Sequence, residues 1–155
     1  MPRSGRAWLL LSGLLAAAAL AVAYALQYLG GYQPCQLCYW QRYPYFAVLA
    51  VTALGVALGR PRHVLLLAAA LFLVTAGIAW YHVGVEQGMF ALPTGCAAGG
   101  EATSIAELKA QLATAAPACD QVGLTILGLS LSNWNALAGM AFALVGVAGW
   151  LRTRS

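Results

Sequence analysis

The chain carries very little charge. Only 8% of its 155 residues are charged, against about 25% in soluble globular proteins, whereas 62% are hydrophobic. It contains no glycine-rich phosphate loop, and its eight Lys and Arg residues do not gather in one basic segment. These shortages exclude an ordinary soluble domain and a nucleic-acid partner. The sequence has long apolar runs instead, which indicate an integral membrane protein.

Four apolar runs are long enough, or nearly long enough, to cross a bilayer, which takes about 20 helical residues. They cover about 8–28, 43–59, 63–83 and 133–150. The second is short and begins beside Pro44, a residue that suits a first helical turn. We therefore expect an all-α membrane protein: one integral membrane domain over residues 1–155, a four-helix transmembrane bundle with loops at about 29–42 and 84–132.

The positions of the charges orient these spans. Six of the eight basic residues occupy three short segments, at Arg3 and Arg6, Arg60 and Arg62, and Arg152 and Arg154, and all four acids fall between 86 and 120. Because cytoplasmic segments carry the excess of Lys and Arg, we expect both termini to be cytoplasmic. All seven tyrosines lie near the opposite ends of the spans, where an interfacial aromatic belt is expected. A cleavable signal peptide is the alternative for the first run, but its removal would leave three spans and break the charge pattern.

The second outer loop contains signals of its own. Ser104 followed by Glu107 matches a capping box, and apolar residues at 105, 108 and 112 follow at helical spacing. We expect a short amphipathic helix there. The apolar segment Val122–Leu131 is too short to span, and we expect it to lie at the membrane interface.

The four cysteines all fall in segments assigned to the outer compartment. Cys35 and Cys38 form a Cys-Gln-Leu-Cys motif in the first loop, and Cys96 and Cys119 lie in the second. A bacterial periplasm would permit disulfides, and the two-residue spacing is that of a thiol pair that closes and reopens. Static structural disulfides are an equally valid interpretation of an even set of cysteines, whereas a four-cysteine zinc site matches the spacing poorly. Arg42, four residues after Cys38, favours a redox pair because a cation stabilises a thiolate.

One family matches these residues in order. The segment Pro34-Cys35-Gln36-Leu37-Cys38-Tyr39-Trp40-Gln41-Arg42, followed by lone cysteines at 96 and 119 between the third and fourth spans, resembles the disulfide bond formation protein B (DsbB) family. The resemblance extends over the whole chain in span count and cysteine order. The periplasmic DsbA, DsbB and quinone system is itself a standard example of kinetic redox control.

The resemblance implies an enzyme of the bacterial inner membrane, a quinone-dependent disulfide oxidoreductase. Its partner would be a periplasmic, DsbA-like thioredoxin-fold dithiol oxidase, which would attack a Cys96–Cys119 disulfide through Cys96. Cys119 would then exchange with Cys35. Cys38 would be released as a thiolate and pass electrons to ubiquinone or menaquinone beside Arg42. No metal is implied.

Several features leave alternatives open. Gln41 stands where members of the family often carry an acid, and His82 and Glu86 lie four residues apart at the outer end of the third span. His82 and Glu86 are candidates for quinone binding or proton handling, and the alternative is an interfacial pair facing water. The vitamin K epoxide reductase family is a second candidate enzyme class, but there the loop cysteines precede the Cys-x-x-Cys motif. A structural membrane protein with braced loops is the non-enzymatic alternative.

Overall fold

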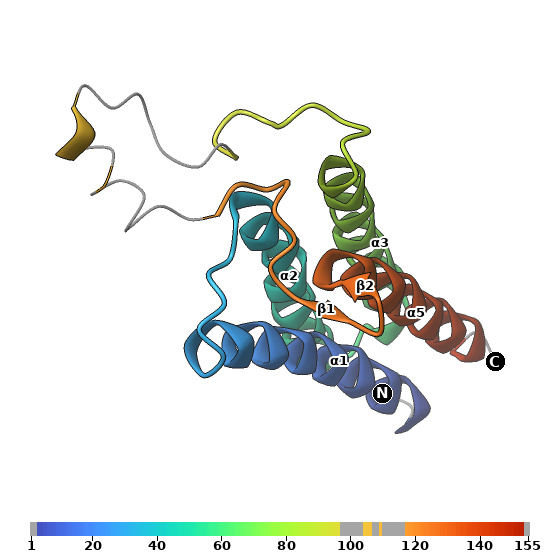
Figure 1. Ribbon diagram of the computed structural model, residues 1–155. Coiled ribbons are helices and arrows are strands. Elements are labelled where there is room, and N and C mark those ends of the chain that lie inside the picture. Colours follow the sequence, from blue (N-terminus) through green and yellow to red (C-terminus); the bar gives the residue numbers. More distant parts are fainter. Residues whose placement is uncertain (1–2, 97–103, 107–108, 110–116, 154–155) are drawn as a thin grey trace.

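Four long helices make up most of the chain. The computed structural model describes residues 3–96, 104–106, 109 and 117–153. The helices within them are α1 (Arg3–Tyr28), α2 (Gln36–Leu58), α3 (Pro61–Glu86) and α5 (Leu131–Arg152) (Figure 1). Two very short strands, β1 (Thr125–Ile126) and β2 (Leu129–Ser130), pair in antiparallel fashion just before α5. The expected all-helical architecture is therefore confirmed, with one small hairpin added.

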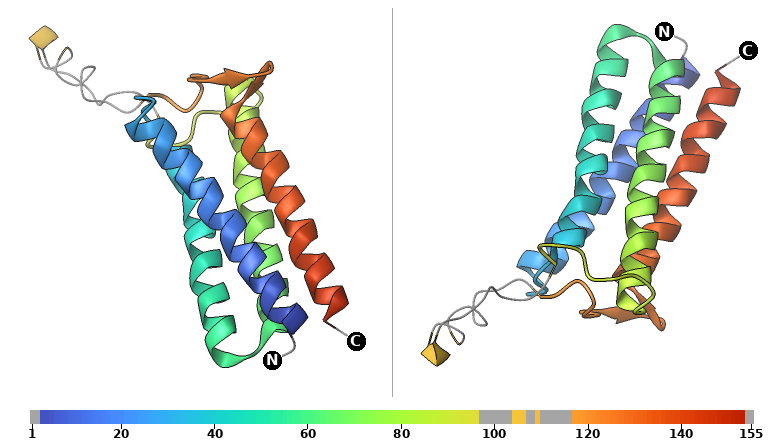
Figure 2. Two further views of the ribbon diagram at one scale, coloured as in Figure 1. Left: turned by 90° about the horizontal axis from the view of Figure 1, so that it is seen from below. Right: turned by 90° about the horizontal axis from the view of Figure 1, so that it is seen from above.

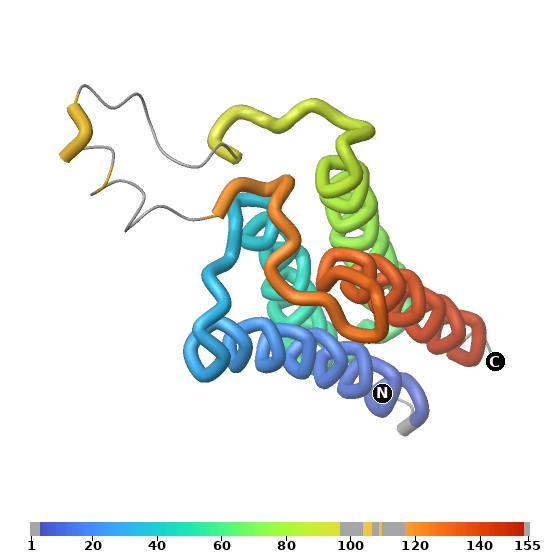
Figure 3. Tube along the Cα trace, in the orientation of Figure 1, coloured from blue at the N-terminus to red at the C-terminus, as the bar shows by residue number. Residues whose placement is uncertain are grey.

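The helices run up and down between two ends of an elongated bundle. Figure 2 shows both termini and the tight α2–α3 turn at one end, and the β1–β2 hairpin at the other. The α1–α2 connection and the segment before β1 also lie at the hairpin end in Figure 2, and the tube in Figure 3 shows the segment before β1 passing close to the start of α2. All segments that contain cysteines are therefore gathered at one end, as the charge pattern predicted.

Small residues let α3 and α5 approach closely. A Cβ atom at Gly139 would lie 3.0 Å from the carbonyl oxygen of Phe72, and one at Gly146 would lie 3.2 Å from that of Leu65. Such close backbone contact is the usual way in which helices associate where lipid replaces water. On the other side of α3, Phe72 packs edge-on against Tyr45 of α2. Helix α3 is therefore packed between α2 and α5.

Three of the helices have the length and hydropathy of membrane spans: Ser4–Tyr28, Pro61–Glu86 and Leu131–Arg152. Helix α2 has 23 residues but falls outside this group, because its first turns contain polar Gln36, Gln41 and Arg42. The chain is a multi-pass membrane protein, and a fourth span formed by α2 stays a prediction.

The structure corrects the placement of Pro44 in a first helical turn, whereas the span at about 43–59 stays a prediction. Helix α2 begins at Gln36, so Pro44 lies inside it. Proline has no N–H to donate to the carbonyl four residues earlier, which usually makes it a helix boundary. Here the helix starts earlier because Cys35 caps it: the Cys35 sulfur accepts from the backbone N–H of Cys38.

The segment Val122–Leu131 contains the hairpin. Leu127 and Gly128 form its two-residue turn and both have positive φ, 53° and 80°, as a type I′ turn requires. The indole N–H of Trp134 donates to the carbonyl of Ile126 at 3.0 Å and ties the hairpin to α5. The amphipathic helix expected after Ser104 lies largely outside the described residues.

Candidate active site

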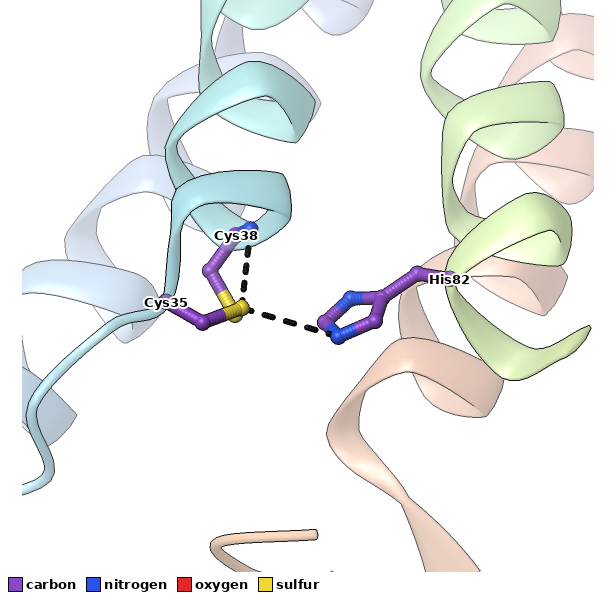
Figure 4. A group of neighbouring side chains, drawn as sticks. All are labelled: Cys35, Cys38 and His82. Atoms are coloured by element: carbon purple, nitrogen blue, oxygen red, sulfur yellow. Dashed lines mark hydrogen bonds between the residues drawn. The ribbon is translucent and has the colours of Figure 1, made fainter. Parts of the chain in front are cut away.

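The Cys-x-x-Cys pair stands at the first turn of α2. Cys35 is the N-cap residue, and its sulfur lies 3.4 Å from the backbone nitrogen of Cys38 and 2.9 Å from the Cys38 sulfur. Figure 4 shows the two cysteines side by side, with His82 of α3 pointing toward them. The backbone N–H groups at a helix start favour negative charge on a capping atom.

This environment makes Cys35 the acidic member of the pair. The pKa of Cys35 is lowered from 9.0 to about 4, chiefly by the hydrogen bond from the Cys38 thiol. Burial opposes this shift, whereas His82 supports it both by a hydrogen bond and by its charge. In the reduced pair, therefore, Cys35 holds the thiolate and Cys38 donates to it.

The loop cysteines form a disulfide immediately beside this pair. Cys96 and Cys119 are bonded, with their Cα atoms 5.2 Å apart, and the N–H of Cys119 donates to the carbonyl of Cys96 at 3.0 Å. Cys96 and Cys119, only 2% and 0% exposed, share one buried cluster with Cys35. The fold thus brings together all four cysteines that the sequence singled out.

His82 and Glu86 lie inside this site. The His82 side chain is 2% exposed, and its Nε2 atom lies 3.5 Å from the Cys35 sulfur and 3.1 Å from the carbonyl oxygen of Cys119. The Glu86 side chain is 7% exposed, with Oε1 3.7 Å from His82 Nε2. The alternative of an interfacial pair facing water was therefore wrong.

Polar residues that sequence reasoning missed complete the surroundings of His82. Ser132 of α5 lies 2.9 Å from His82 Nδ1 and donates to Glu86 Oε1 at 2.7 Å, while Ser130 donates to Glu86 Oε2 at 2.6 Å. The side-chain amide of Gln41 approaches the same His82 nitrogen at 2.8 Å. Ser130 and Ser132 stand at the boundary of an apolar run, where serine is common in any loop, so the sequence offered little signal.

Asn135 and Tyr45 extend this network across the bundle. The Asn135 amide donates to Gln41 Oε1 at 2.6 Å, and the Tyr45 hydroxyl donates to Asn135 Oδ1 at 2.6 Å. Thr75 of α3 donates to the backbone carbonyl of Gln41 at 2.8 Å. Asn135 and Thr75 lie within apolar runs, where an amide or hydroxyl usually marks a contact between helices. That signal was available in the sequence.

Arg42 is a buried cation held by neutral partners. It is 7% exposed, and it donates to Gln27 Oε1 of α1 at 2.7 Å. Its guanidinium lies 4.8 Å from the ring centroid of Tyr24 and 5.0 Å from that of Tyr39. Among the described residues, no carboxylate pairs with Arg42. Within the described part of the chain, the site therefore holds a positive charge that no carboxylate neutralises.

A cavity of about 870 Å³ connects these groups. The residues that border it include Cys35, Cys38, Arg42 and His82, together with apolar side chains such as Ala19 and Phe142 from the membrane-spanning parts of α1 and α5. A mostly apolar cavity with a few convergent polar groups is the usual form of a small-molecule site.

Cys35, Cys38 and His82 also offer three ligand atoms within 4.8 Å of one another. A tetrahedral zinc ion with Zn–S bonds of about 2.3 Å needs its two sulfurs about 3.7 Å apart. The 2.9 Å between the sulfurs here is too short for that geometry. The donor set fits a dithiol pair with a neighbouring base better than a metal site.

Comparison with known proteins decides the family. The sequence profile of the family described as "Disulfide bond formation protein DsbB" matches residues 5–149. The chain belongs to the DsbB family. A Disulfide bond formation protein B of Azoarcus sp. (strain BH72) is 31% identical, over 97% of this chain and 94% of its own length. Another, of Polaromonas sp. (strain JS666 / ATCC BAA-500), is 28% identical, over 90% and 86%. No solved structure matches the chain.

Membership of the DsbB family agrees with the chemistry of the site. The family name denotes disulfide bond formation, and the structure brings a free thiol pair and a disulfide into one buried cluster in a helical membrane protein. The chain is thus a membrane protein with a disulfide oxidoreductase role.

Proposed function

We propose that the protein is a thiol:quinone oxidoreductase, which reoxidises a periplasmic, DsbA-like thioredoxin-fold dithiol oxidase and delivers the electrons to ubiquinone or menaquinone. The observation that carries this proposal is the cavity that borders the Cys35–Cys38 pair and also holds Arg42, a buried cation with no carboxylate partner among the described residues. A static structural role for the cysteines gives no reason for such a cavity.

The cavity suits a quinone in its size and in the residues that line it. Its volume of about 870 Å³ lies within the usual range for small-molecule sites, and its apolar walls reach along α1 and α5 into the membrane-spanning part of the bundle. Arg42 would hold a quinone oxygen, where a fixed cation stabilises negative charge that develops during reduction. A bound quinone supplies a two-electron acceptor.

The arrangement of the cysteines supports a relay of two disulfides. The partner thiolate attacks Cys96 and releases Cys119, which in turn attacks Cys35 of the oxidised pair. Cys38 is thereby freed from its bond to Cys35. The second partner thiol then displaces Cys96, and Cys96 re-forms its bond to Cys119 and releases Cys35. Closing the Cys35–Cys38 disulfide gives up two electrons and two protons, which would reduce the bound quinone to a quinol. Each exchange forms one S–S bond and breaks another, so the number of disulfides is conserved until the acceptor is reduced. Because Cys96 is 2% exposed, the partner reaches it only when the buried cluster opens.

The proposed location is the bacterial inner membrane, with both termini in the cytoplasm and the cysteine end in the periplasm. Leu127 at the hairpin turn is 89% exposed, and the exposed Arg60 lies in the α2–α3 turn at the opposite end. In a chain otherwise free of cysteine, Leu127→Cys should react with an impermeant maleimide in intact cells. Arg60→Cys should react only after permeabilisation. The reverse pattern would contradict this orientation.

The deciding experiment uses the purified, detergent-solubilised protein with a water-soluble ubiquinone analogue. A reduced thioredoxin-fold oxidase should be oxidised in step with loss of the quinone absorbance, and Cys38→Ser should abolish both. A visible charge-transfer band is expected when the wild-type thiolate and quinone are together. A structural role predicts no quinone consumption and no band, and either absence in correctly folded protein would refute the relay.

A further inference from the structure

Two groups contact the Nδ1 atom of His82, and they favour opposite protonation states of that atom. The Gln41 amide nitrogen lies 2.8 Å from this atom and the Ser132 hydroxyl oxygen 2.9 Å from it. An amide N–H can only donate, so it suits an unprotonated Nδ1. A hydroxyl that already donates its proton to another group can only accept from Nδ1, so it favours a protonated Nδ1.

The orientation of the Gln41 amide is set by its other contacts. Its Nε2 atom also donates to the carbonyl of Leu37 at 3.3 Å, and its Oε1 atom accepts from Asn135. Asn135 is itself held in this sense because its Oδ1 atom accepts from the hydroxyl of Tyr45. Gln41 therefore presents an N–H group to His82, which favours the neutral ring.

Ser132 favours the charged ring. Its hydroxyl donates to Glu86 Oε1 at 2.7 Å, so only a lone pair is left to face His82 Nδ1. Glu86 also accepts from Ser130, so both of its carboxylate oxygens accept hydrogen bonds. With Glu86 ionised, a proton on Nδ1 completes a continuous chain of hydrogen bonds from His82 through Ser132 to Glu86.

The other ring nitrogen is a donor in both states. Nε2 faces the carbonyl oxygen of Cys119 at 3.1 Å, which can only accept, and the Cys35 sulfur at 3.5 Å. The proton that the His82 ring gains and loses is therefore the one on Nδ1. Among residues 3–96, 104–106, 109 and 117–153, the charged or titratable groups around the ring are Glu86 on its own helix and Cys35 and Cys38 from α2. Helix α5 contributes the neutral Ser132.

We propose that Ser132 is a positioning residue that conducts a proton between Glu86 and His82 Nδ1, so that the imidazolium forms and disappears in step with the Cys35 thiolate. The protonated Glu86 gives its proton to the Ser132 oxygen, and Ser132 gives its own to Nδ1. The proton on Glu86 comes from the outer aqueous phase, and the transfer leaves Glu86 as the carboxylate that accepts from Ser130 and Ser132. When the Cys35 thiolate is consumed, the proton on Nδ1 returns through Ser132 to Glu86 by the reverse transfers. Only protons move along this path, and no electrons are transferred. This inference rests on the proposed redox cycle of the Cys35–Cys38 pair.

The chain offers a matched pair of serines for the test. Ser130 and Ser132 both donate to Glu86, but only Ser132 reaches His82. With a reduced thioredoxin-fold donor and a ubiquinone analogue, Ser132→Ala should lower the turnover number at least about tenfold, since general acid–base groups contribute about 10²–10⁴. Ser132→Thr keeps a hydroxyl and should recover most of the rate, and small buffer acids should partly rescue Ser132→Ala. Ser130→Ala should show a much smaller loss and no rescue.

A second measurement needs no quinone. The chain has two histidines, so His63→Gln leaves His82 as the single source of ¹⁵N-histidine signals. Reduction of the Cys35–Cys38 pair with dithiothreitol should protonate Nδ1 when Ser132 is present and leave the ring neutral in Ser132→Ala. If the ring stays neutral when the cysteine pair is reduced in the His63→Gln protein that keeps Ser132, the proposal is overturned. Equal turnover numbers for Ser132→Ala and Ser130→Ala would overturn it as well.

The two readouts separate the failure of this inference from that of the proposed function. Absence of quinone reduction in the parent chain, with Nδ1 protonation intact, would refute the quinone cycle alone. Normal quinone reduction with unaltered Ser132→Ala kinetics would refute the proton path alone. If Ser132→Ala does not accumulate in the membrane, Glu86→Gln provides the same test, because an amide preserves the shape but cannot supply the proton.

Discussion

Replacement of Arg42 by alanine should impair quinone reduction much more than folding. The change removes a charged hydrogen bond to Gln27, of the kind worth about 1.5–3 kcal/mol, and two cation–π contacts, which at a buried site are worth about 2 kcal/mol each. It also relieves the cost of burying an unpaired cation, which offsets much of that loss. We therefore expect a net loss of stability of no more than about 2 kcal/mol.

The effect on the reaction has no such offset. A preorganised donor that faces developing negative charge contributes about 2.7–4 kcal/mol, so Arg42→Ala should lower quinone reduction by about a hundredfold or more. Arg42→Lys keeps the charge but loses the planar fork and should fall between alanine and the parent chain. The exposed Arg60, at the opposite end of the bundle, gives the control Arg60→Ala.

The assay is quinone reduction by a reduced thioredoxin-fold donor in detergent, with the apparent quinone affinity and the amount of protein in the membrane measured on the same preparations. Normal reduction by Arg42→Ala would refute the reasoning. A loss that merely follows lower accumulation in the membrane would do the same, because Arg42 would then be a structural anchor.

Three further outcomes are expected. Cys119→Ala should trap the partner on Cys96 as a mixed disulfide visible on a non-reducing gel, because the resolving thiol is gone; a gel without an adduct that depends on Cys96 would contradict the order of the relay. The thiolate absorbance of reduced protein should persist as the pH falls until about pH 4, the pKa of Cys35. Since folding lowers this pKa from 9.0, the thiolate's stabilisation of the reduced fold is full above pH 9 and is lost as the pH falls toward 4; disappearance of the absorbance near pH 8 would count against it. Gly139→Leu should destabilise α3–α5 packing by about 1–3 kcal/mol in a thermal-unfolding assay, whereas Gly77→Leu, where nothing lies within 4 Å, should not.

The sequence predicted the helical bundle and the gathering of the cysteines because both follow from simple physical rules. Apolar runs and the placement of arginines identify helices and their ends without any knowledge of packing. The start of α2 could not be predicted in this way, because Pro44 gives a strong boundary signal and the cap that actually begins the helix is the sulfur of Cys35.

The site was predicted less completely than the fold. Motif and spacing pointed to Cys35, Cys38 and Arg42, which lie close together in the chain, while Cys96 and Cys119 stood out as the two remaining cysteines. The contact between His82 and Ser132 depends on α5 packing beside α3, and the apolar periodicity of a helix does not reveal which neighbour it has. Contacts between residues 50 positions apart therefore required the structure.

The junction of Gln41, Thr75 and Asn135 has a consequence for how the protein assembles. It joins three helices, α2, α3 and α5, through uncharged groups. Alanine- and leucine-rich surfaces fit one another at many vertical offsets, and lipid tails compete equally well for all of them. A helix displaced by one turn would keep its apolar contacts but leave these amides without partners in a medium that offers no water. The junction that orients the histidine thus also selects one alignment of the inserted helices from many of similar energy.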